Sequence, residues 1–231
     1  ISQAQSLRES AIQDTNNLIP VTLSKIFEEG RLKGWKDRTL GEICEETSNI
    51  NWNEHKEKYF RYIDLSAVSR KDFSIVKTQV VNFKNAPSRA KKIINTYDVI
   101  FGTTRPTLMR VTIIPAEFNN HICSTGFAVL RARKGRVLPQ FIYYFIRSEQ
   151  FMERMENIQT GASYPAVSDT KVLETKIPLP PLAEQKKIVE RMDALTQKVR
   201  KLQKLQSETA ANLTALKQSI LHQAFQGELI N

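Results

Sequence analysis

Apolar residues near the end of the chain recur in alternating steps of four and three residues. A repeat of this length keeps one apolar stripe along a helix, and a second helix must cover that stripe. We call this stripe the seam; it consists of Ile188, Met192, Leu195, Val199, Leu202, Leu213, Leu216 and Ile220. Gln206 and Thr209 interrupt it, and polar residues at such positions more often fix the register of helix pairing than bind a ligand. The pattern predicts a long helix that pairs through its seam.

A proline-rich segment, Ile177 to Pro181, marks where this helix begins. Proline lacks a backbone N–H and holds the preceding residue in an extended conformation, so the helix is expected to start just after Pro181. No proline or glycine follows before Gly227. A helix from Glu184 to Gln226 would be about 65 Å long. The sequence therefore predicts a rigid spacer that holds other parts of the protein apart.

The first 30 residues resemble a short copy of the end of this helix. The aligned pairs are Leu18 with Leu216, Leu23 with Leu221, and Phe27 with Phe225. A glycine follows each copy, at Gly30 and Gly227, where it would cap a helix C-terminus. This internal repeat flanks the middle of the chain. We expect the chain to enter and leave a middle domain through equivalent helix ends.

Between residues 34 and 177 the periodicity changes to short apolar runs. Five runs rich in β-branched or aromatic residues are separated by polar stretches, which is typical of strands. They are Tyr62–Leu65, Val80–Phe83, Asp98–Phe101, Arg110–Ile114 and Gly126–Leu130. An aromatic segment at residues 139–146, continued to residue 159, predicts a helix with its aromatic face buried. The predicted fold class is α+β, with an N-terminal helical segment (1–33), a globular domain (34–177) and a long helix with a C-terminal cap (178–231).

The charge balance indicates a polyanionic partner. The 231 residues include 34 Lys and Arg against 24 Asp and Glu, a net charge of +10. Residues 33–176 contain 23 of the basic residues and 15 of the acidic ones, so they carry +8 of this charge. Nucleic acid is favoured over a membrane surface because no basic amphipathic anchor is visible. No apolar run approaches the roughly 20 residues of a membrane span. Two distant cysteines, Cys44 and Cys123, suit a reducing compartment, so we expect a cytoplasmic protein.

Residues that could carry chemistry are few. His55, His121 and His222 are scattered, and the sequence contains no zinc-type histidine pair, cysteine cluster or glycine-rich nucleotide loop. We interpret each histidine as an ordinary surface or partly buried side chain. The sequence therefore predicts no catalytic, metal-binding or cofactor-binding residues in this chain. A nuclease or modification enzyme is disfavoured for the same reason.

Three segments suit contact with nucleic acid. The loop at Gly102–Pro106 offers two hydroxyls and a guanidinium that can bind guanine through two hydrogen bonds. The run from Ser88 to Lys92 suits phosphates, and the small-residue loop at Thr160–Pro165 can approach a backbone closely and presents Tyr164. The predicted DNA-binding residues are Arg105, Thr103, Thr104, Arg89, Lys91, Lys92, Ser163, Tyr164 and Gly161. For each segment, a solvated loop is the alternative interpretation.

Several motifs taken together resemble a known family. The segment Thr160–Ser168, the hinge Ile177–Gln185 and a long basic helix that closes in Ser219–Leu229 are similar to those of the DNA specificity (S) subunit of type I restriction-modification enzymes. Asp98–Arg105 and Ser124–Arg131 resemble the target recognition domain of that family. The resemblance covers roughly residues 35 to 229, and the hinge is its most specific part.

The resemblance implies a non-catalytic, sequence-specific DNA-recognition subunit. In this family a target recognition domain reads one half of a bipartite DNA target, and a long helix sets the distance to a second recognition domain. Methyltransferase (M) subunits, which use S-adenosylmethionine, dock on this scaffold, and a motor-nuclease (R) subunit is recruited for cleavage. The implied partners are double-stranded DNA and the M and R subunits, with no cofactor in this chain and no membrane.

The sequence departs from the family pattern in its domain count. Full-length members carry two recognition domains and two helical regions, whereas this chain has one domain, one helical region after it and a helix tail before it. Because it also begins at Ile1 instead of Met, we expect either half of a longer subunit or a natural half-subunit that forms a homodimer. In both cases an antiparallel helix pair would cover the seam. The alternative function is a scaffold or decoy that binds M subunits without binding DNA.

Overall fold

The computed structural model describes residues 2 to 226, apart from the side chains of residues 2–5 and 224. It divides into two compact units. The helical unit takes its described residues from the start of the chain up to Ile19 and from Arg191 onward, and the mixed unit is Pro20–Glu190. The α+β class with a long C-terminal helix is confirmed. The predicted boundaries after residues 33 and 177 stay a prediction; the two units divide after Ile19 and after Glu190.

In the described part of the chain, ten strands form three sheets. The orders are β4-β3-β8-β5, β2-β9-β6-β7 and a two-stranded ribbon, β1-β10. Neighbouring strands are antiparallel except for the parallel pair β3 and β8. The strands are β1 Lys36–Thr39, β2 Cys44–Glu45, β3 Phe60–Ile63, β4 Gln79–Val81, β5 Ala90–Ile94, β6 Val99–Gly102, β7 Val111–Ile113, β8 His121–Ser124, β9 Phe127–Ala132 and β10 Lys176–Leu179.

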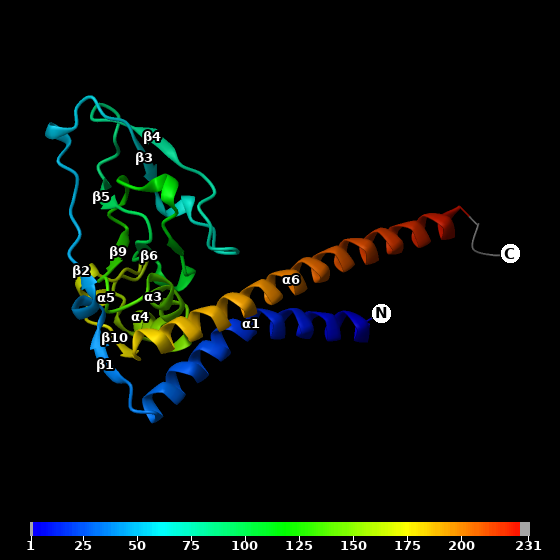
Figure 1. Ribbon diagram of the computed structural model, residues 1–231. Coiled ribbons are helices and arrows are strands. Elements are labelled where there is room, and N and C mark those ends of the chain that lie inside the picture. The colour runs from blue at the N-terminus through cyan, green and yellow to red at the C-terminus, as the bar shows by residue number, and fades with distance from the viewer. Residues whose placement is uncertain (1, 227–231) are drawn as a thin grey trace. The chain divides into compact units, whose positions relative to one another are not determined.

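Two long helices and four short ones accompany the sheets in residues 2–226. They are α1 Ser2–Leu32, α2 Leu40–Ile43, α3 Pro139–Ile146, α4 Glu149–Ile158, α5 Asp169–Leu173 and α6 Leu182–Phe225, with 3-10 turns at Trp52–Glu54, Leu65–Ala67, Pro106–Leu108 and Ala116–Phe118. Helices α3, α4 and α5 lie beside the β2-β9-β6-β7 sheet, and the β4-β3-β8-β5 sheet lies farther from them (Figure 1). No helix among the described residues is both long and apolar enough to cross a bilayer.

One core cluster of the mixed unit lies between its two larger sheets. Ile63 and Cys123 of one sheet belong to the same buried cluster as Ile100 and Phe127 of the other. Fully burying a side chain of this size contributes about 1.5–3 kcal/mol. Burial raises the pKa of the free Cys123 thiol and raises that of the free Cys44 thiol to about 12. Both thiols therefore stay protonated at neutral pH and act as packing groups.

The second half of α1 packs on α3. Phe27 is fully buried, and its ring meets the rings of Phe141 and Phe145 edge-on at 5.6 and 5.2 Å between centroids. The C-terminal end of α1 is also closely packed, because a Cβ at Gly30 would lie 2.1 Å from the Trp35 ring. The N-terminal segment is thus a 31-residue helix, longer than the short helix tail that the repeat suggested.

The five predicted strands are present as β3, β4, β6, β7 and β9. The sequence prediction missed the other five strands of the described chain, β1, β2, β5, β8 and β10. Of these, β5 contains most of the segment interpreted as an exposed basic run. Neighbouring side chains on a strand face opposite sides, so Lys91 is exposed while Lys92 is partly buried. The register shifts between Ala90 and Lys92, where the strand bulges.

The predicted helix at residues 139–159 is broken into α3 and α4. Ser148 lies between them in an extended conformation, with φ −78° and ψ 151°. Its hydroxyl donates a hydrogen bond of 2.7 Å to the carbonyl of Phe145. A serine hydroxyl that binds the backbone in this way competes with continuation of the helix.

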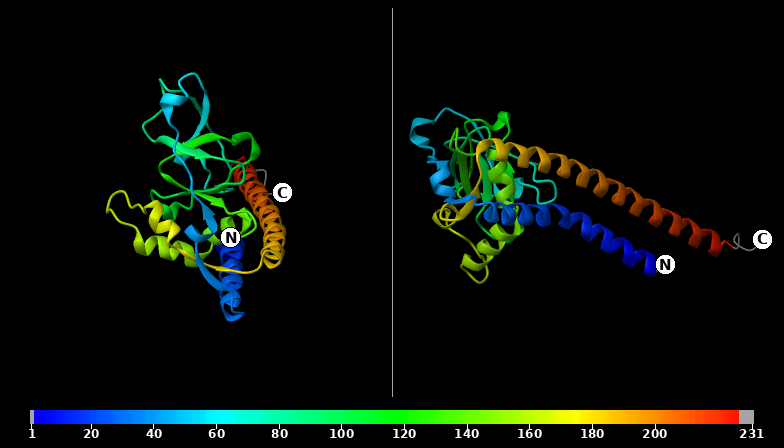
Figure 2. Two further views of the ribbon diagram at one scale, coloured as in Figure 1. Left: turned by 60° about the vertical axis from the view of Figure 1, so that its left-hand side comes forward. Right: turned by 60° about the horizontal axis from the view of Figure 1, so that its bottom comes forward.

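The helical unit joins the first part of α1 to α6 through a polar contact. The Gln206 side chain donates to the Thr15 hydroxyl at 2.9 Å and to the Ala11 carbonyl at 3.1 Å, and Gln203 donates to Asn16 at 2.9 Å. Residue numbers rise along one helix as they fall along the other, so the helices are antiparallel, as Figure 2 shows from two sides. Gln206 thus fixes the helix register, as its position in the seam predicts.

Helix α6 buries only the first part of the seam. Ile188, Met192 and Val199 are buried, and Leu195 is partly buried. The remaining seam residues are between 44% and 56% exposed: Leu202, Leu213, Leu216 and Ile220. Thr209, the other polar interruption, donates a hydrogen bond of 2.8 Å to the Leu205 carbonyl of its own helix. The predicted C-terminal cap at Gly227 lies outside the described residues.

Candidate nucleic-acid interface

The loop after β6 holds Arg105 in an unusual backbone conformation. Arg105 has φ 50° and ψ 61°, in the left-handed region that non-glycine residues rarely adopt. Met109, at the other end of the short 3-10 turn Pro106–Leu108, is also left-handed. The Arg105 N–H donates to the Pro165 carbonyl at 2.6 Å. These constraints fix where the exposed Arg105 side chain leaves the backbone.

The Arg105 loop and the Gly161–Tyr164 loop lie side by side. Backbone bridges join Ala166 to Thr104 and to Thr160, and the Val167 N–H donates to the Thr103 carbonyl at 2.9 Å. The guanidinium carbon of Arg105 lies 5.1 Å from the centre of the Tyr164 ring. Two segments that the sequence singled out separately therefore form one surface.

Gly161 allows the turn that presents Tyr164. Its φ is 97°, and a Cβ at this position would lie 2.9 Å from the backbone oxygen of Tyr164. A side chain at residue 161 would therefore be strained and would clash. Tyr164 itself is 72% exposed, so its ring covers Arg105 on one side and is open to a partner on the other.

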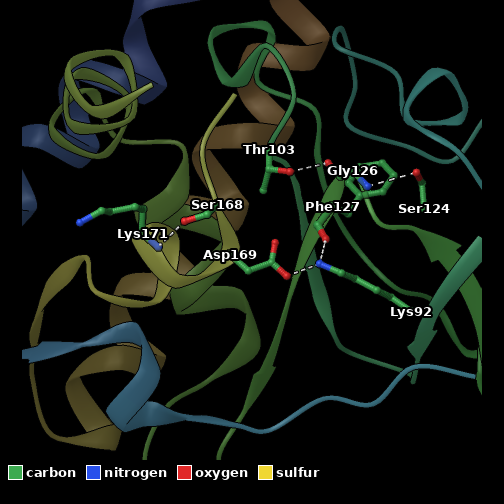
Figure 3. Close-up of polar contacts among 8 residues, drawn as sticks. All are labelled: Lys92, Thr103, Ser124, Gly126, Phe127, Ser168, Asp169 and Lys171. Atoms are coloured by element: carbon green, nitrogen blue, oxygen red, sulfur yellow. Dashed lines mark hydrogen bonds and ion pairs between the residues drawn. The ribbon is translucent and has the colours of Figure 1, made fainter. Parts of the chain in front are cut away.

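The turn between β8 and β9 connects these loops to the third predicted segment. Thr103 donates to the Gly126 carbonyl through its backbone N–H at 2.8 Å and through its hydroxyl at 2.9 Å. Gly126 in turn donates to the Ser124 hydroxyl at 3.1 Å (Figure 3). The Thr125 N–H donates to the Arg89 carbonyl at 2.9 Å. We call Ser124–Gly126 the hub, because all three predicted segments reach it directly or through Thr103.

Lys92 has a structural role in place of the predicted phosphate contact. Its ammonium forms an ion pair with Asp169 and donates to the Phe127 carbonyl at 2.5 Å (Figure 3). The Lys92 side chain is only 12% exposed, so we remove it from the predicted DNA contacts. The ion pair fastens the start of α5, which Ser168 caps by accepting from the Lys171 N–H at 3.3 Å.

The other predicted residues divide by exposure. Six of them are exposed and remain candidates: Arg105, Arg89, Lys91, Gly161, Ser163 and Tyr164. Thr104 is partly buried, and Thr103 is 5% exposed with its hydroxyl committed to Gly126. Sequence reasoning missed Asp169 and the hub. The serine and aspartate at 168–169 are typical of a helix N-terminus, and that signal could have located α5.

A buried ion pair supports the strand that leads into the Arg105 loop. Asp98 is 2% exposed and accepts from the Arg131 side chain at 3.0 and 2.8 Å. This hydrogen bonding raises the pKa of Arg131 above its already high ordinary value. The pair joins β9 to the residue before β6. It also links the first residue of the Asp98–Arg105 motif to the last residue of the Ser124–Arg131 motif. Among the described residues, no cluster of three or more His, Cys, Asp or Glu side chains could hold a metal ion.

Comparison with known proteins places these features in one family. The family described as the type I restriction modification DNA specificity domain matches residues 32–209. The HindI specificity subunit of Haemophilus influenzae is 25% identical over 171 residues, covering 73% of this chain and 36% of the relative. The EcoDI specificity subunit of Escherichia coli is 29% identical over 140 residues, covering 61% of this chain and 30% of the relative. The chain thus spans about a third of these curated relatives.

Two solved structures share the fold at higher identity. The crystal structure of the HsdS subunit from Thermoanaerobacter tengcongensis has a TM-score of 0.71 and 38% identity, covering 80% of this chain and 48% of that one. A chain from a structural study of complex assembly and conformational transition in a type I restriction-modification system has a TM-score of 0.77 and 38% identity, covering 83% and 49%. The chain spans about half of each.

Proposed function

Because the chain belongs to the family of type I restriction modification DNA specificity domains, we propose that it reads one half of a bipartite sequence in double-stranded DNA. The observation that carries this proposal is that hydrogen bonds join the Arg105 loop to the Gly161–Tyr164 loop and, through Thr103, to the hub. Loops that contact bases must be held in place, since a hydrogen bond to a base edge depends on geometry within a few tenths of an ångström. The chain performs no catalysis itself.

Arg105 is the residue that we assign to a base. A guanidinium presents its N–H donors in a fixed plane and can bind O6 and N7 of guanine together in the major groove. The Tyr164 ring at 5.1 Å covers one face of the guanidinium and leaves its edge free to donate. Ser163 and Tyr164 lie beside it as further polar contacts.

Arg89 and Lys91 are the residues that we assign to phosphates. Both are exposed and flank the start of β5, next to the hub. Phosphate contacts set the position and register of a protein on duplex DNA, while base contacts supply the specificity. The residues of this interface therefore divide into a reading group around Arg105 and a positioning group around Arg89.

We also propose that the chain scaffolds its partners. Methyltransferase subunits, which supply the S-adenosylmethionine chemistry, and a motor-nuclease subunit would assemble around it. The repeat supports a second recognition half: Phe27 is buried against α3, whereas Phe225, its equivalent at the end of α6, is 89% exposed. Leu221 is 47% exposed, although its equivalent, Leu23, is fully buried. A second half, on the same polypeptide or in a homodimer, would cover these residues.

Replacing Arg105 with Ala tests the assignment. In the complex with methyltransferase subunits, we expect a loss of about 1–3 kcal/mol, or roughly 5- to 150-fold, on duplexes selected from a randomised pool. The base preference should relax at one base pair and stay unchanged at the others. Arg89→Ala should instead weaken binding equally on all sequences and lower its dependence on salt.

Two outcomes would contradict the proposal. Equal weakening by Arg105→Ala on every sequence would make Arg105 a backbone contact. The absence of any salt-sensitive DNA binding, even with the methyltransferase subunits present, would favour the scaffold or decoy over the DNA reader.

A further inference from the structure

A tight hairpin between β3 and β4 carries exposed cations. Val68 and Ile75 form a backbone bridge, the Val76 N–H donates to the Ala67 carbonyl at 2.8 Å, and the Ser69 N–H donates to the Ser74 carbonyl at 2.9 Å. Arg70 and Lys71 occupy its tip and are exposed. The closing hydrogen bonds make this loop a defined projection. We call residues 68–76 the basic hairpin.

The one acidic residue of the basic hairpin is used within the turn. Hydrogen bonding by the Ser69 side chain, and further by Ser74, lowers the pKa of the Asp72 carboxyl. The Ser69 hydroxyl also accepts from the Lys71 N–H at 3.2 Å. The carboxylate therefore serves to order the turn, while the neighbouring cations face solvent. These hydrogen bonds order the turn and so fix where Arg70 and Lys71 leave the backbone.

An aromatic side chain fastens the hairpin to the helices. Phe73 has φ 60°, which is strained for an aromatic residue. Its ring lies 4.2 Å from the guanidinium carbon of Arg147, which also donates to the Tyr143 hydroxyl at 3.2 Å. Arg147 is 6% exposed, and its Nε has no hydrogen-bond partner among the described residues. A buried cation of this kind attracts an aromatic face, so the contact compensates for the strain at Phe73.

The root of the hairpin rests on the candidate DNA interface. Leu65 lies over two glycines: a Cβ on Gly126 would be 2.9 Å from its side chain, and one on Gly102 would be 3.2 Å away. The Arg110 side chain donates to the Val68 carbonyl at 2.7 Å. Gly126 is in the hub, and Gly102 and Arg110 flank the Arg105 loop. The hairpin is therefore built on the same support as the reading residues.

We infer that the basic hairpin is a second DNA-contacting element, in which Arg70 and Lys71 bind backbone phosphates and Phe73 is a positioning residue. This inference rests on the proposed function. Cations on an ordered turn beside a base-reading loop suit phosphates, because such contacts fix the register of the reading residues without carrying sequence information. Two other interpretations compete with this one: Arg70 and Lys71 bind an acidic surface of a partner subunit, or they contact only solvent. The test below separates them.

The double variant Arg70→Ala/Lys71→Ala in the complex with methyltransferase subunits is the main test. We expect weaker binding to selected and unselected duplexes alike, with the slope of log affinity against log salt reduced by about 2, or about 0.9 for each phosphate lost. The base preference should be unchanged. Lys134→Ala/Arg136→Ala is the matched control, because these exposed cations follow the far end of β9, about 20 Å from the hub; it should leave the slope as it is.

Phe73 variants test the positioning role without changing charge. Phe73→Ala should lower the affinity on all sequences alike and reduce the salt slope, although it removes no charge. Phe73→Tyr should restore both, because the ring still covers Arg147. A thermal melt identifies a variant that has simply unfolded. An unchanged affinity in folded Phe73→Ala would remove Phe73 from the proposal.

The result that would overturn the inference is an unchanged salt slope in Arg70→Ala/Lys71→Ala. If that variant instead releases methyltransferase subunits, the hairpin binds protein. When Arg105→Ala still shifts the base preference, only the hairpin proposal fails. When no protein in the set binds DNA in a salt-dependent way, the hairpin proposal and the proposed function fail together.

Discussion

Arg105 combines a strained backbone with an exposed charged side chain. Its left-handed backbone costs roughly 1–2 kcal/mol, and its guanidinium is exposed beside an exposed aromatic ring. The hydrogen bond to Pro165 and the glycine turn at Gly161 maintain this arrangement. Strain held in this way at an exposed loop is typical of a binding surface.

His121 makes the mixed unit sensitive to acid. Its Nδ1 accepts a hydrogen bond from the Arg61 N–H at 3.2 Å. Burial, and then the positive charge of Arg61, lower the pKa of His121 below its ordinary value. Since the unfolded state takes up the proton first, the stability that His121 contributes is present above about pH 6.5 and is lost as the pH falls through the folded-state pKa.

We therefore predict that, as the pH falls below about 6.5, the free energy of unfolding decreases more for the wild type than for His121→Asn, which cannot titrate. Urea unfolding at a series of pH values measures this difference. His222→Asn, at an exposed position on α6, controls for the loss of one histidine. Parallel pH profiles for the wild type and His121→Asn would contradict the assignment.

Sequence reasoning singled out the segments of the candidate interface but not the contacts that their side chains make. Arg105 and Tyr164 were singled out in separate segments, and the structure brings them together. Lys91 and Lys92 could not be distinguished, because composition does not reveal which lysine of a pair turns toward a carboxylate. That depends on Asp169, which is 77 residues away from Lys92 in the chain.

At the scale of elements, the ion pair of Lys92 and Asp169 fastens α5 to β5. Lys92→Met should leave Asp169 without its cation and the Phe127 carbonyl without its donor. We expect a loss of about 1–3 kcal/mol in the free energy of unfolding, the usual cost of an unmade buried hydrogen bond. Denaturant melts measure it.

Lys91→Met is the control for this prediction, because Lys91 is the exposed neighbour on the same strand. It should change the stability by less than about 0.5 kcal/mol, as surface substitutions usually do. Equal stability of the two variants would mean that the Lys92 ion pair contributes nothing to the fold.

The elements that the sequence predicted best were those with a clear apolar period. The five strand-like runs and the long helix α6 are all present. β5 was missed because its lysines hide the alternation of a strand, and β2, with two residues, is too short to give a pattern. The break between α3 and α4 was missed because it depends on a single serine hydroxyl and not on proline or glycine.

At the scale of the whole molecule, half of the seam is left exposed, and we expect another helix to cover it. Leu213, Leu216 and Ile220 are 49%, 56% and 46% exposed, and a helix stripe of this kind is stable in water only when it is covered. The sequence pattern revealed the seam but not how much of it would remain uncovered, because coverage depends on the length and position of the second helix.

Leu213→Lys with Ile220→Lys should break the pairing of two recognition halves. The mass of the purified complex should fall by one half if the halves are separate chains; if they share one polypeptide, the mass stays and the melting transition broadens. Thr214→Lys, an exposed position off the seam on the same helix, is the control. Mass and melting equal to those of the control would contradict a role for the seam.

Selection from a pool of randomised duplexes by the complex with methyltransferase subunits will show whether this chain reads half of a bipartite DNA target. We expect the enriched duplexes to share two short specified blocks at a constant spacing, and we expect Arg105→Ala to relax one base pair in the block read by this chain. Enrichment of a single block, or no enrichment over the starting pool, would contradict this expectation.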